Sequence, residues 1–130
     1  MIVLAWNCRW LGNLETIHAL GRLVSSKDPH VIFVCETRLS RRRAENLKRR
    51  YGMSSCIAVD SSSECTTRLM IMWKEEVQAN LIAFSNIHID VEISMGEEQF
   101  RFTGLHGFSD TRKSDTWFSM DRIRYMPALP

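Results

Sequence analysis

Short apolar runs and helically spaced apolar positions alternate along the first part of the chain. Residues 2–6 and 31–35 are apolar runs of strand length, and each run ends in polar residues. Between them, apolar side chains recur every three or four positions over residues 14–24, which predicts an amphipathic helix that ends before Pro29. Continuous apolar runs of this kind are typical of strands that are covered on both faces.

A second helix is predicted over residues 41–51, where Ser40 can act as the N-cap and Gly52 as the stop. The segments that follow are predicted strands, at 53–59, 69–73, 77–84, 87–93 and 100–106. The strand at 87–93 alternates apolar residues with His88, Asp90 and Glu92, so one face is predicted to be buried and the other wet.

A polar connection over residues 109–114 leads to a last predicted helix over 115–125. The resulting order is strand, helix, strand, helix, a cluster of strands and a final helix, without repeats or low-complexity tracts. This order predicts a single domain over residues 1–130 with an α/β (α+β) layered sandwich.

Composition narrows the class of protein. A chain of 130 residues with 45% hydrophobic and 25% charged residues suits one globular domain and excludes disorder of the whole chain. No apolar run approaches the ~20 residues of a membrane span, and the first residues lack a basic leader, so we expect an intracellular protein. The four cysteines form no C-x-x-C pair, and we expect reduced thiols and not a disulfide or a metal site.

Two polar residues follow the first two buried strands. Asn7 comes directly after the first apolar run and Glu36 directly after the second. If these strands are parallel neighbours, both side chains lie at the carboxyl edge of the sheet, where open sheets commonly bind ligands. An amide oxygen and a carboxylate are hard ligands that suit Mg²⁺. On these residues alone, a turn asparagine and a solvated glutamate remain an open alternative.

Four short motifs, taken in their order along the chain, resemble those of a known protein family. They are Trp6-Asn7-Cys8-Arg9, Val31-Ile32-Phe33-Val34-Cys35-Glu36-Thr37, Leu69-Met70-Ile71-Met72-Trp73-Lys74 and Phe102-Thr103-Gly104-Leu105-His106-Gly107. Together they resemble the endonuclease/exonuclease/phosphatase family and, more narrowly, the endonuclease part of plant LINE-type (non-LTR) retrotransposons. The chain departs from the family where Trp10 and Arg68 replace glycines.

The resemblance implies a two-sheet sandwich flanked by helices that cleaves phosphodiesters with Mg²⁺, or with Mn²⁺ in its place. It implies that Asn7 positions the phosphate and the attacking water and that Glu36 ligates the metal ion. His106 stands near the position of a family tyrosine that contacts the phosphate. It could donate to a phosphate in the same way, or it could be a structural histidine at a strand end.

Two family motifs are absent from the chain. Neither the Gly-Asp-Phe-Asn motif nor the Ser-Asp-His motif, which supplies the general base, occurs in the sequence. Acid–base groups of this kind typically contribute ~10²–10⁴-fold each to the rate. We therefore expect a partial fold of about half of the domain, with little or no nuclease activity unless the missing half or a partner chain completes it.

A basic segment is the second candidate site, although the net charge of the whole chain is only +2. Its cations are Arg41, Arg42, Arg43, Lys48, Arg49 and Arg50. They could pair with DNA phosphates and release counterions, which makes a non-catalytic nucleic-acid-binding domain the alternative function. Two other interpretations stay open: a solvated outer helix that turns Ala44 and Leu47 toward the sheet, and a decayed coding remnant without a selected function.

Overall fold

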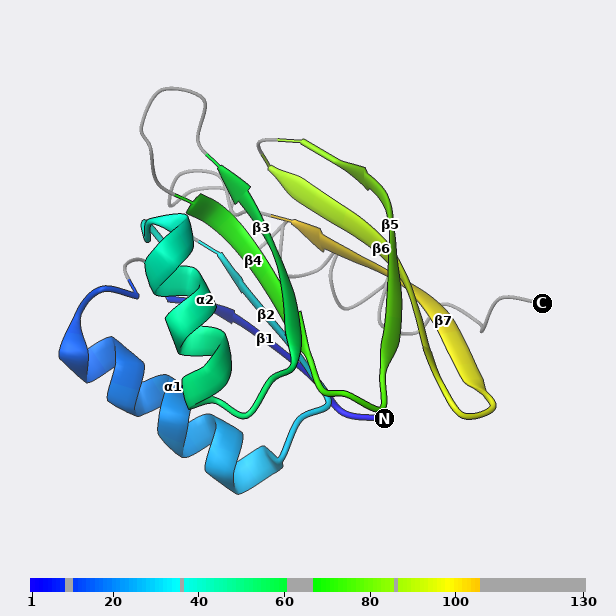
Figure 1. Cartoon of the computed structure of the whole chain (residues 1–130), viewed down its shortest axis with the longest axis horizontal. Helices are drawn as coiled ribbons and strands as arrows, with labels where there is room; N and C mark the ends of the chain where they lie inside the picture. Colours follow the sequence, from blue (N-terminus) through cyan, green and yellow to red (C-terminus); the bar gives the residue numbers. More distant parts are fainter. Residues whose placement is uncertain (9–10, 36, 61–66, 86, 106–130) are drawn as a thin grey trace.

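The computed structural model describes residues 1–8, 11–35, 37–60, 67–85 and 87–105 (Figure 1). Within these residues the chain forms two helices and two sheets. The elements in chain order are β1 (Val3–Asn7), α1 (Leu14–Lys27), β2 (Val31–Cys35), α2 (Arg41–Arg50), β3 (Ser55–Asp60), β4 (Thr67–Trp73), β5 (Gln78–Phe84), β6 (His88–Met95) and β7 (Glu98–Leu105). The predicted strands and the first two predicted helices are confirmed, and the helix predicted over 115–125 lies outside the described residues.

The first sheet has the strand order β1-β2-β4-β3. β1 and β2 are parallel and run in register from Val3 opposite Val31 to Asn7 opposite Cys35. β4 is antiparallel to both β2 and β3. β2 therefore lies inside the sheet, as expected of a strand that is apolar on both faces.

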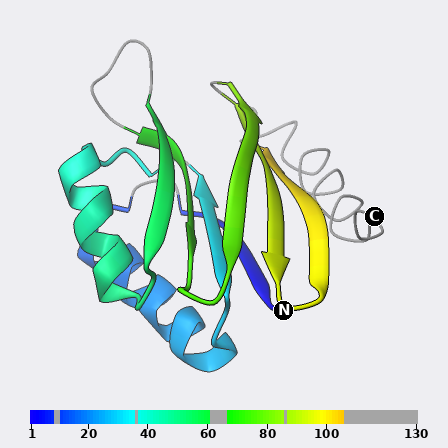
Figure 2. The same ribbon diagram turned by 45° about the vertical axis from the view of Figure 1, so that its right-hand side comes forward.

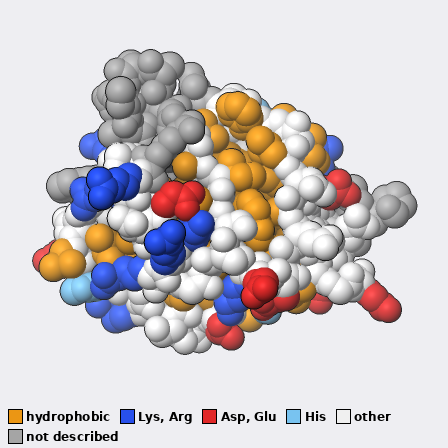
Figure 3. Space-filling model, in the orientation of Figure 1, with side chains coloured by type: hydrophobic (Ala, Val, Ile, Leu, Met, Phe, Trp, Pro, Cys, Tyr) orange, Lys and Arg blue, Asp and Glu red, His pale blue; other side chains and the backbone are white. Residues whose placement is uncertain are grey.

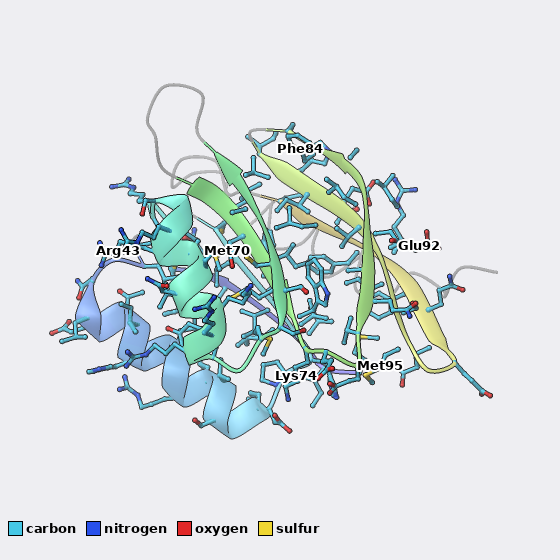
Figure 4. The ribbon with its side chains drawn as sticks, in the orientation of Figure 1. Arg43, Met70, Lys74, Phe84, Glu92 and Met95 are labelled. Carbon is cyan, nitrogen blue, oxygen red and sulfur yellow. The ribbon has the colours of Figure 1, made fainter. Side chains whose placement is uncertain are left out.

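The second sheet is an antiparallel meander with the order β5-β6-β7. It faces the first sheet on the side away from the helices, so the described part of the molecule has three layers (Figures 1 and 2). The core has two parts, one on each face of the first sheet, and the side chains of β2 contribute to both. Ile32 and Val34 pack toward the helices, whereas Val31, Phe33 and Cys35 pack toward the second sheet. Figure 4 shows Met70 of β4 on the helix side of the first sheet, where it joins the first of these clusters.

The helices begin and end where the sequence predicts. The side chain of Asn13 accepts a hydrogen bond from the amide of Glu15 at the start of α1, and Asp28 ends that helix with φ 45°. Ser40 caps α2 by accepting a hydrogen bond from the amide of Arg43. Neither helix of the described residues is long and apolar enough to cross a membrane.

The alternation predicted for β6 is confirmed on its apolar side and wrong at one polar position. Ile89, Val91 and Ile93 are buried against the first sheet. Asp90 points to the other face, yet it is also buried, at 5% exposure. Its carboxylate forms an ion pair with Arg101 of β7 and accepts a hydrogen bond from Thr103 at 3.1 Å. These cross-strand partners replace the water that the alternation predicts for this position.

Candidate functional site

The candidate site lies at the carboxyl edge of β1 and β2, where Asn7 ends the first strand. Asn7 is half-buried and lies opposite Cys35, the last residue of β2. The two strands are parallel neighbours, which is the condition on which the candidate site depends. Glu36, the next residue in the sequence after Cys35, lies outside the described residues, and so does His106.

Hydrogen bonds continue past the ends of both strands and hold the two chain segments together. The amide of Cys8 donates to the carbonyl oxygen of Cys35 at 3.2 Å, and its thiol donates to the same oxygen at 3.2 Å. Farther along, the amide of Leu11 donates to the carbonyl oxygen of Thr37 at 3.0 Å. The segments that follow β1 and β2 are thus joined on either side of position 36.

The segment after β2 is tightly anchored. Thr37 is fully buried, Leu39 is buried at 1% exposure, and Leu11 is buried beside them. Between these anchors Arg38 has φ 51°, a left-handed conformation that L-residues with long side chains rarely adopt. Residues held in such conformations persist where the surrounding structure determines them, and they cluster at functional sites.

The donor chemistry of this edge fits a hard divalent cation. The side chain of Asn7 contains an amide oxygen, and Glu36, the other predicted ligand, is not among the described residues. Mg²⁺ is commonly bound through one or two carboxylates and keeps several of its waters, so it does not need a dense cluster of protein ligands. Such a cluster of three or more His, Cys, Asp or Glu side chains is not found among the described residues. Cys8, Cys35 and Cys56 form no disulfide within that part of the chain.

The second candidate site, the basic segment, coincides with α2. Arg42, Arg43, Arg49 and Arg50 are exposed, and the side chain of Arg41 lies outside the described set. Lys48 differs from them because its ammonium forms an ion pair with Glu45 at 2.7 Å.

The opposite face of α2 behaves as predicted. Ala44 and Leu47 are buried at 1% and 8% exposure, and both belong to the core cluster between the helices and the first sheet.

The sequence did not predict a hollow that lies between α1 and α2. It is lined by Arg50 of α2 together with His18 and Arg22 of α1. His18 and Arg22 are four positions apart, a spacing that puts both on one face of a helix, and this was the available signal. That this face meets the basic helix depends on how the two helices pack, which the spacing does not determine.

Comparisons with known proteins give a fold and no closer relationship. No model of a protein family matches the sequence, and a search of the curated proteins finds no match either. Solved structures do match. Truncated Caenorhabditis elegans TDP2 has a TM-score of 0.59 at 16% identity, over 94% of this chain and 54% of that chain.

Two further solved structures show a similar match. D. rerio TDP2 complexed with a single-strand DNA product has a TM-score of 0.57 at 13% identity, over 96% of this chain and 55% of that chain. The endonuclease domain of TRAS1, a telomere-specific non-LTR retrotransposon, has a TM-score of 0.57 at 10% identity, over 92% of this chain and 50% of that chain. At these identities the likeness establishes the fold and not the activity.

The chain spans about half the length of these solved structures. Its two sheets and flanking helices correspond to theirs, which confirms the predicted architecture. The chain thus has the fold of the endonuclease/exonuclease/phosphatase enzymes, represented here over roughly half of their length.

Proposed function

We propose that this chain provides the metal-binding edge of a Mg²⁺-dependent phosphodiester hydrolase that acts on DNA. The observation that carries the proposal is the parallel pairing of β1 and β2, which sets Asn7 opposite Cys35. Asn7 and the residue that follows Cys35 therefore come from adjoining strand ends. The fold shared with DNA-processing enzymes supports the same function.

Each proposed residue has a distinct task in this reaction. Glu36 holds the cation, and the side-chain amide of Asn7 donates to a phosphate oxygen or orients the attacking water. A bound Mg²⁺ neutralises the charge that gathers on the phosphoryl group during attack. His106 is proposed to donate a hydrogen bond to the phosphate.

The finer proposal is an endonuclease of plant LINE-type retrotransposon origin. It rests on the four ordered motifs, among them Trp6-Asn7-Cys8-Arg9. The similarity of the fold to the TRAS1 endonuclease domain supports a retrotransposon origin.

Metal binding can be tested apart from activity. Titration of the chain with Mn²⁺ should broaden the NMR amide signals of Asn7, Cys8 and Cys35 first, because paramagnetic broadening is strongest near the ion. Glu36→Gln should remove this local broadening. Glu97→Gln is the matched control, since Glu97 is an exposed side chain in the turn between β6 and β7, away from the strand ends. Broadening that is absent or that survives in Glu36→Gln would refute the metal site.

Hydrolysis is tested by nicking of supercoiled plasmid. We expect slow, Mg²⁺-dependent nicking that Asn7→Ala and Glu36→Gln abolish and Glu97→Gln retains. Local Mn²⁺ binding without any nicking would limit the chain to a metal-binding role and would contradict its activity as a hydrolase.

A second candidate function is non-catalytic binding of nucleic acid through α2. The exposure of Arg42, Arg43, Arg49 and Arg50 on this helix favours it. Retention of DNA should then be salt-dependent, should survive Glu36→Gln, and should be lost when Arg41, Arg42 and Arg43 are replaced by glutamine.

A further inference from the structure

Two adjoining hollows form a groove between α1 and α2. The larger one, about 650 Å³, is lined by Ile17, His18, Gly21, Arg22, Ser25, Ser26 and Arg50. The smaller one, about 200 Å³, is lined by Leu11, Ile17, Leu39, Arg43, Asn46, Leu47 and Arg50. Because Ile17 and Arg50 line both hollows, the groove is continuous from the start of α2 to the end of α1.

The packing of the helices keeps the groove open. The hydroxyl group of Tyr51 donates to the carbonyl oxygen of Ile17 at 2.9 Å and joins the end of α2 to the first turn of α1. Gly21 has no side chain to fill the larger hollow, and a Cβ there would only reach van der Waals contact with the ring of Tyr51, at 3.8 Å. The hydrogen bond from Tyr51 therefore helps to hold together the two helices that form the walls of the groove.

The charge of the groove is positive. Arg22 enters from α1, whereas Arg43 and Arg50 enter from α2, and no lining residue within the described part of the chain is acidic. Figure 3 shows Lys and Arg side chains gathered over the two helices, and Figure 4 shows Arg43 on the α1 side of α2.

The one acidic residue of α2 is engaged on the other side of the helix. Glu45 forms an ion pair with Lys48 at 2.7 Å and accepts a hydrogen bond from the thiol of Cys56 in β3 at 3.5 Å. Its carboxylate therefore faces β3 and does not neutralise the arginines that line the groove.

The spacing of the cations suits several phosphates in a row. Arg50 lies seven positions after Arg43, which corresponds to about 10 Å along a helix with a rise of 1.5 Å per residue. One strand of DNA carries a charge about every 3.4 Å along its axis, so this length spans about three phosphates. The hydroxyl groups of Ser25 and Ser26 and the amide of Asn46 add uncharged hydrogen-bonding groups.

We propose that the groove between α1 and α2 binds the phosphate backbone of a DNA strand, apart from the metal-binding edge. This inference rests on the proposed function, since it takes DNA as the substrate. Binding is expected to involve mainly phosphates, because the lining of the described groove contains three arginines and no Phe, Tyr or Trp side chain on which a base could stack. It assigns the contact to Arg22, Arg43 and Arg50. In this it differs from the second candidate function, which uses all the exposed arginines of α2, because Arg42 and Arg49 do not line the groove.

The test compares two double variants with the same change in charge. Arg22→Gln/Arg50→Gln removes two cations from the groove, and Arg42→Gln/Arg49→Gln removes two exposed arginines that do not line it. Binding of a short fluorescent DNA duplex is measured by anisotropy over a series of salt concentrations, with EDTA present so that no divalent ion contributes.

We expect the groove variant to lower affinity on the order of tenfold and to reduce the slope of log K against log salt by about 1.8, as for two lost phosphate contacts. The control variant should lie within about twofold of the parent chain. Equal losses in both variants would show diffuse attraction only and would overturn the proposal, as would absence of binding by the parent chain.

The proposed metal site and the proposed DNA-binding groove can be refuted independently of each other. Glu36→Gln should leave binding in EDTA unchanged, because the groove does not include that residue. A normal DNA result with no local Mn²⁺ broadening would reject only the metal site, and the reverse pattern would reject only the groove. In both double variants, an unchanged melting curve and NMR spectrum outside the helices should show that the fold is intact.

Discussion

A single glycine determines how closely the two sheets approach. Gly104 of β7 lies against the ring of Phe33 in β2, and a Cβ at position 104 would be 2.4 Å from that ring. The ring cannot withdraw, because Phe33 is fully buried and packs edge-on against Phe102, with ring centroids 5.7 Å apart. The sheet-to-sheet contact therefore requires glycine here.

We expect Gly104→Ala to lower the free energy of unfolding by about 1–3 kcal/mol, the typical cost of overpacking a dense core. Urea denaturation followed by tryptophan fluorescence provides the measurement. An unfolding free energy equal to that of the parent chain would show that the sheets can separate to admit a methyl group, contrary to this packing.

The buried carboxylate of Asp90 gives a pH-dependent contribution to stability. The hydrogen bond from Arg101 lowers the pKa of Asp90 below its usual 3.8, and the hydrogen bond from Thr103 acts in the same direction. A carboxyl group with a lower pKa in the folded state stabilises the protein above its unfolded pKa, and this stabilisation is lost as the pH falls through the folded pKa.

Asp90→Asn should therefore destabilise the protein at pH 7 by about 1–3 kcal/mol, because the network loses its negative charge and one of its two acceptor oxygens. Below pH 4 its stability should fall less steeply than that of the parent chain. Urea midpoints between pH 2.5 and pH 7 test both points, with exposed Glu97→Gln as the control. Parallel pH profiles for the Asp90 variant and the parent chain would contradict the assignment.

At the scale of helices and strands, the local sequence pattern predicted most of the fold, because the residues that form the core also set that pattern. The five apolar residues of β2 indicated a strand covered on both faces, and the structure divides them between two core clusters. The apolar runs alone left open whether β1 and β2 are parallel neighbours; the structure shows that they are, and Asn7 lies opposite Cys35.

Contacts between elements were less predictable. The period-two alternation of β6 assigns Asp90 to a face but cannot reveal Arg101 as its partner, since that contact depends on the register with β7. The spacing of His18 and Arg22 likewise cannot reveal that α1 turns them toward α2.

α1 contains a glycine whose replacement should have the opposite effect to that at position 104. Gly21 lies in the helix interior, where glycine costs about 0.8–1 kcal/mol relative to alanine. The added Cβ would meet Tyr51 at an ordinary 3.8 Å. We expect Gly21→Ala to raise the free energy of unfolding by about 1 kcal/mol in urea denaturation, and a loss of stability would show that the helices pack more tightly at this point.

At the scale of the whole molecule, the second sheet exposes apolar side chains along β5 and just after it. Leu81, Ile82, Phe84 and Ile87 are between 38% and 60% exposed. Figure 3 shows apolar side chains along this side of the molecule, and Figure 4 shows Phe84 near the end of β5. β5 is also an outer strand of its sheet. An apolar edge strand of this kind favours association between chains.

Phe84→Lys should reduce this association without lowering stability by more than about 0.5 kcal/mol, because the ring is exposed. Light scattering at high protein concentration is the measurement. Gln78→Lys on the same strand is the matched control, since it adds the same charge at an exposed polar position. A similar reduction in both variants would attribute the effect to charge and not to the apolar edge.

The meander of β5, β6 and β7 also has a consequence for the order of folding. Its pairings join strands that are adjacent in the sequence, whereas β2 must find β1 across α1 and β4 across α2 and β3. Local pairings lose less chain entropy before they form, so we expect the meander to assemble first and the mixed sheet to close onto it. Pulse-labelled hydrogen exchange during refolding should protect amides of β6 before those of β2. The candidate metal-binding edge would then be among the last parts of the molecule to form.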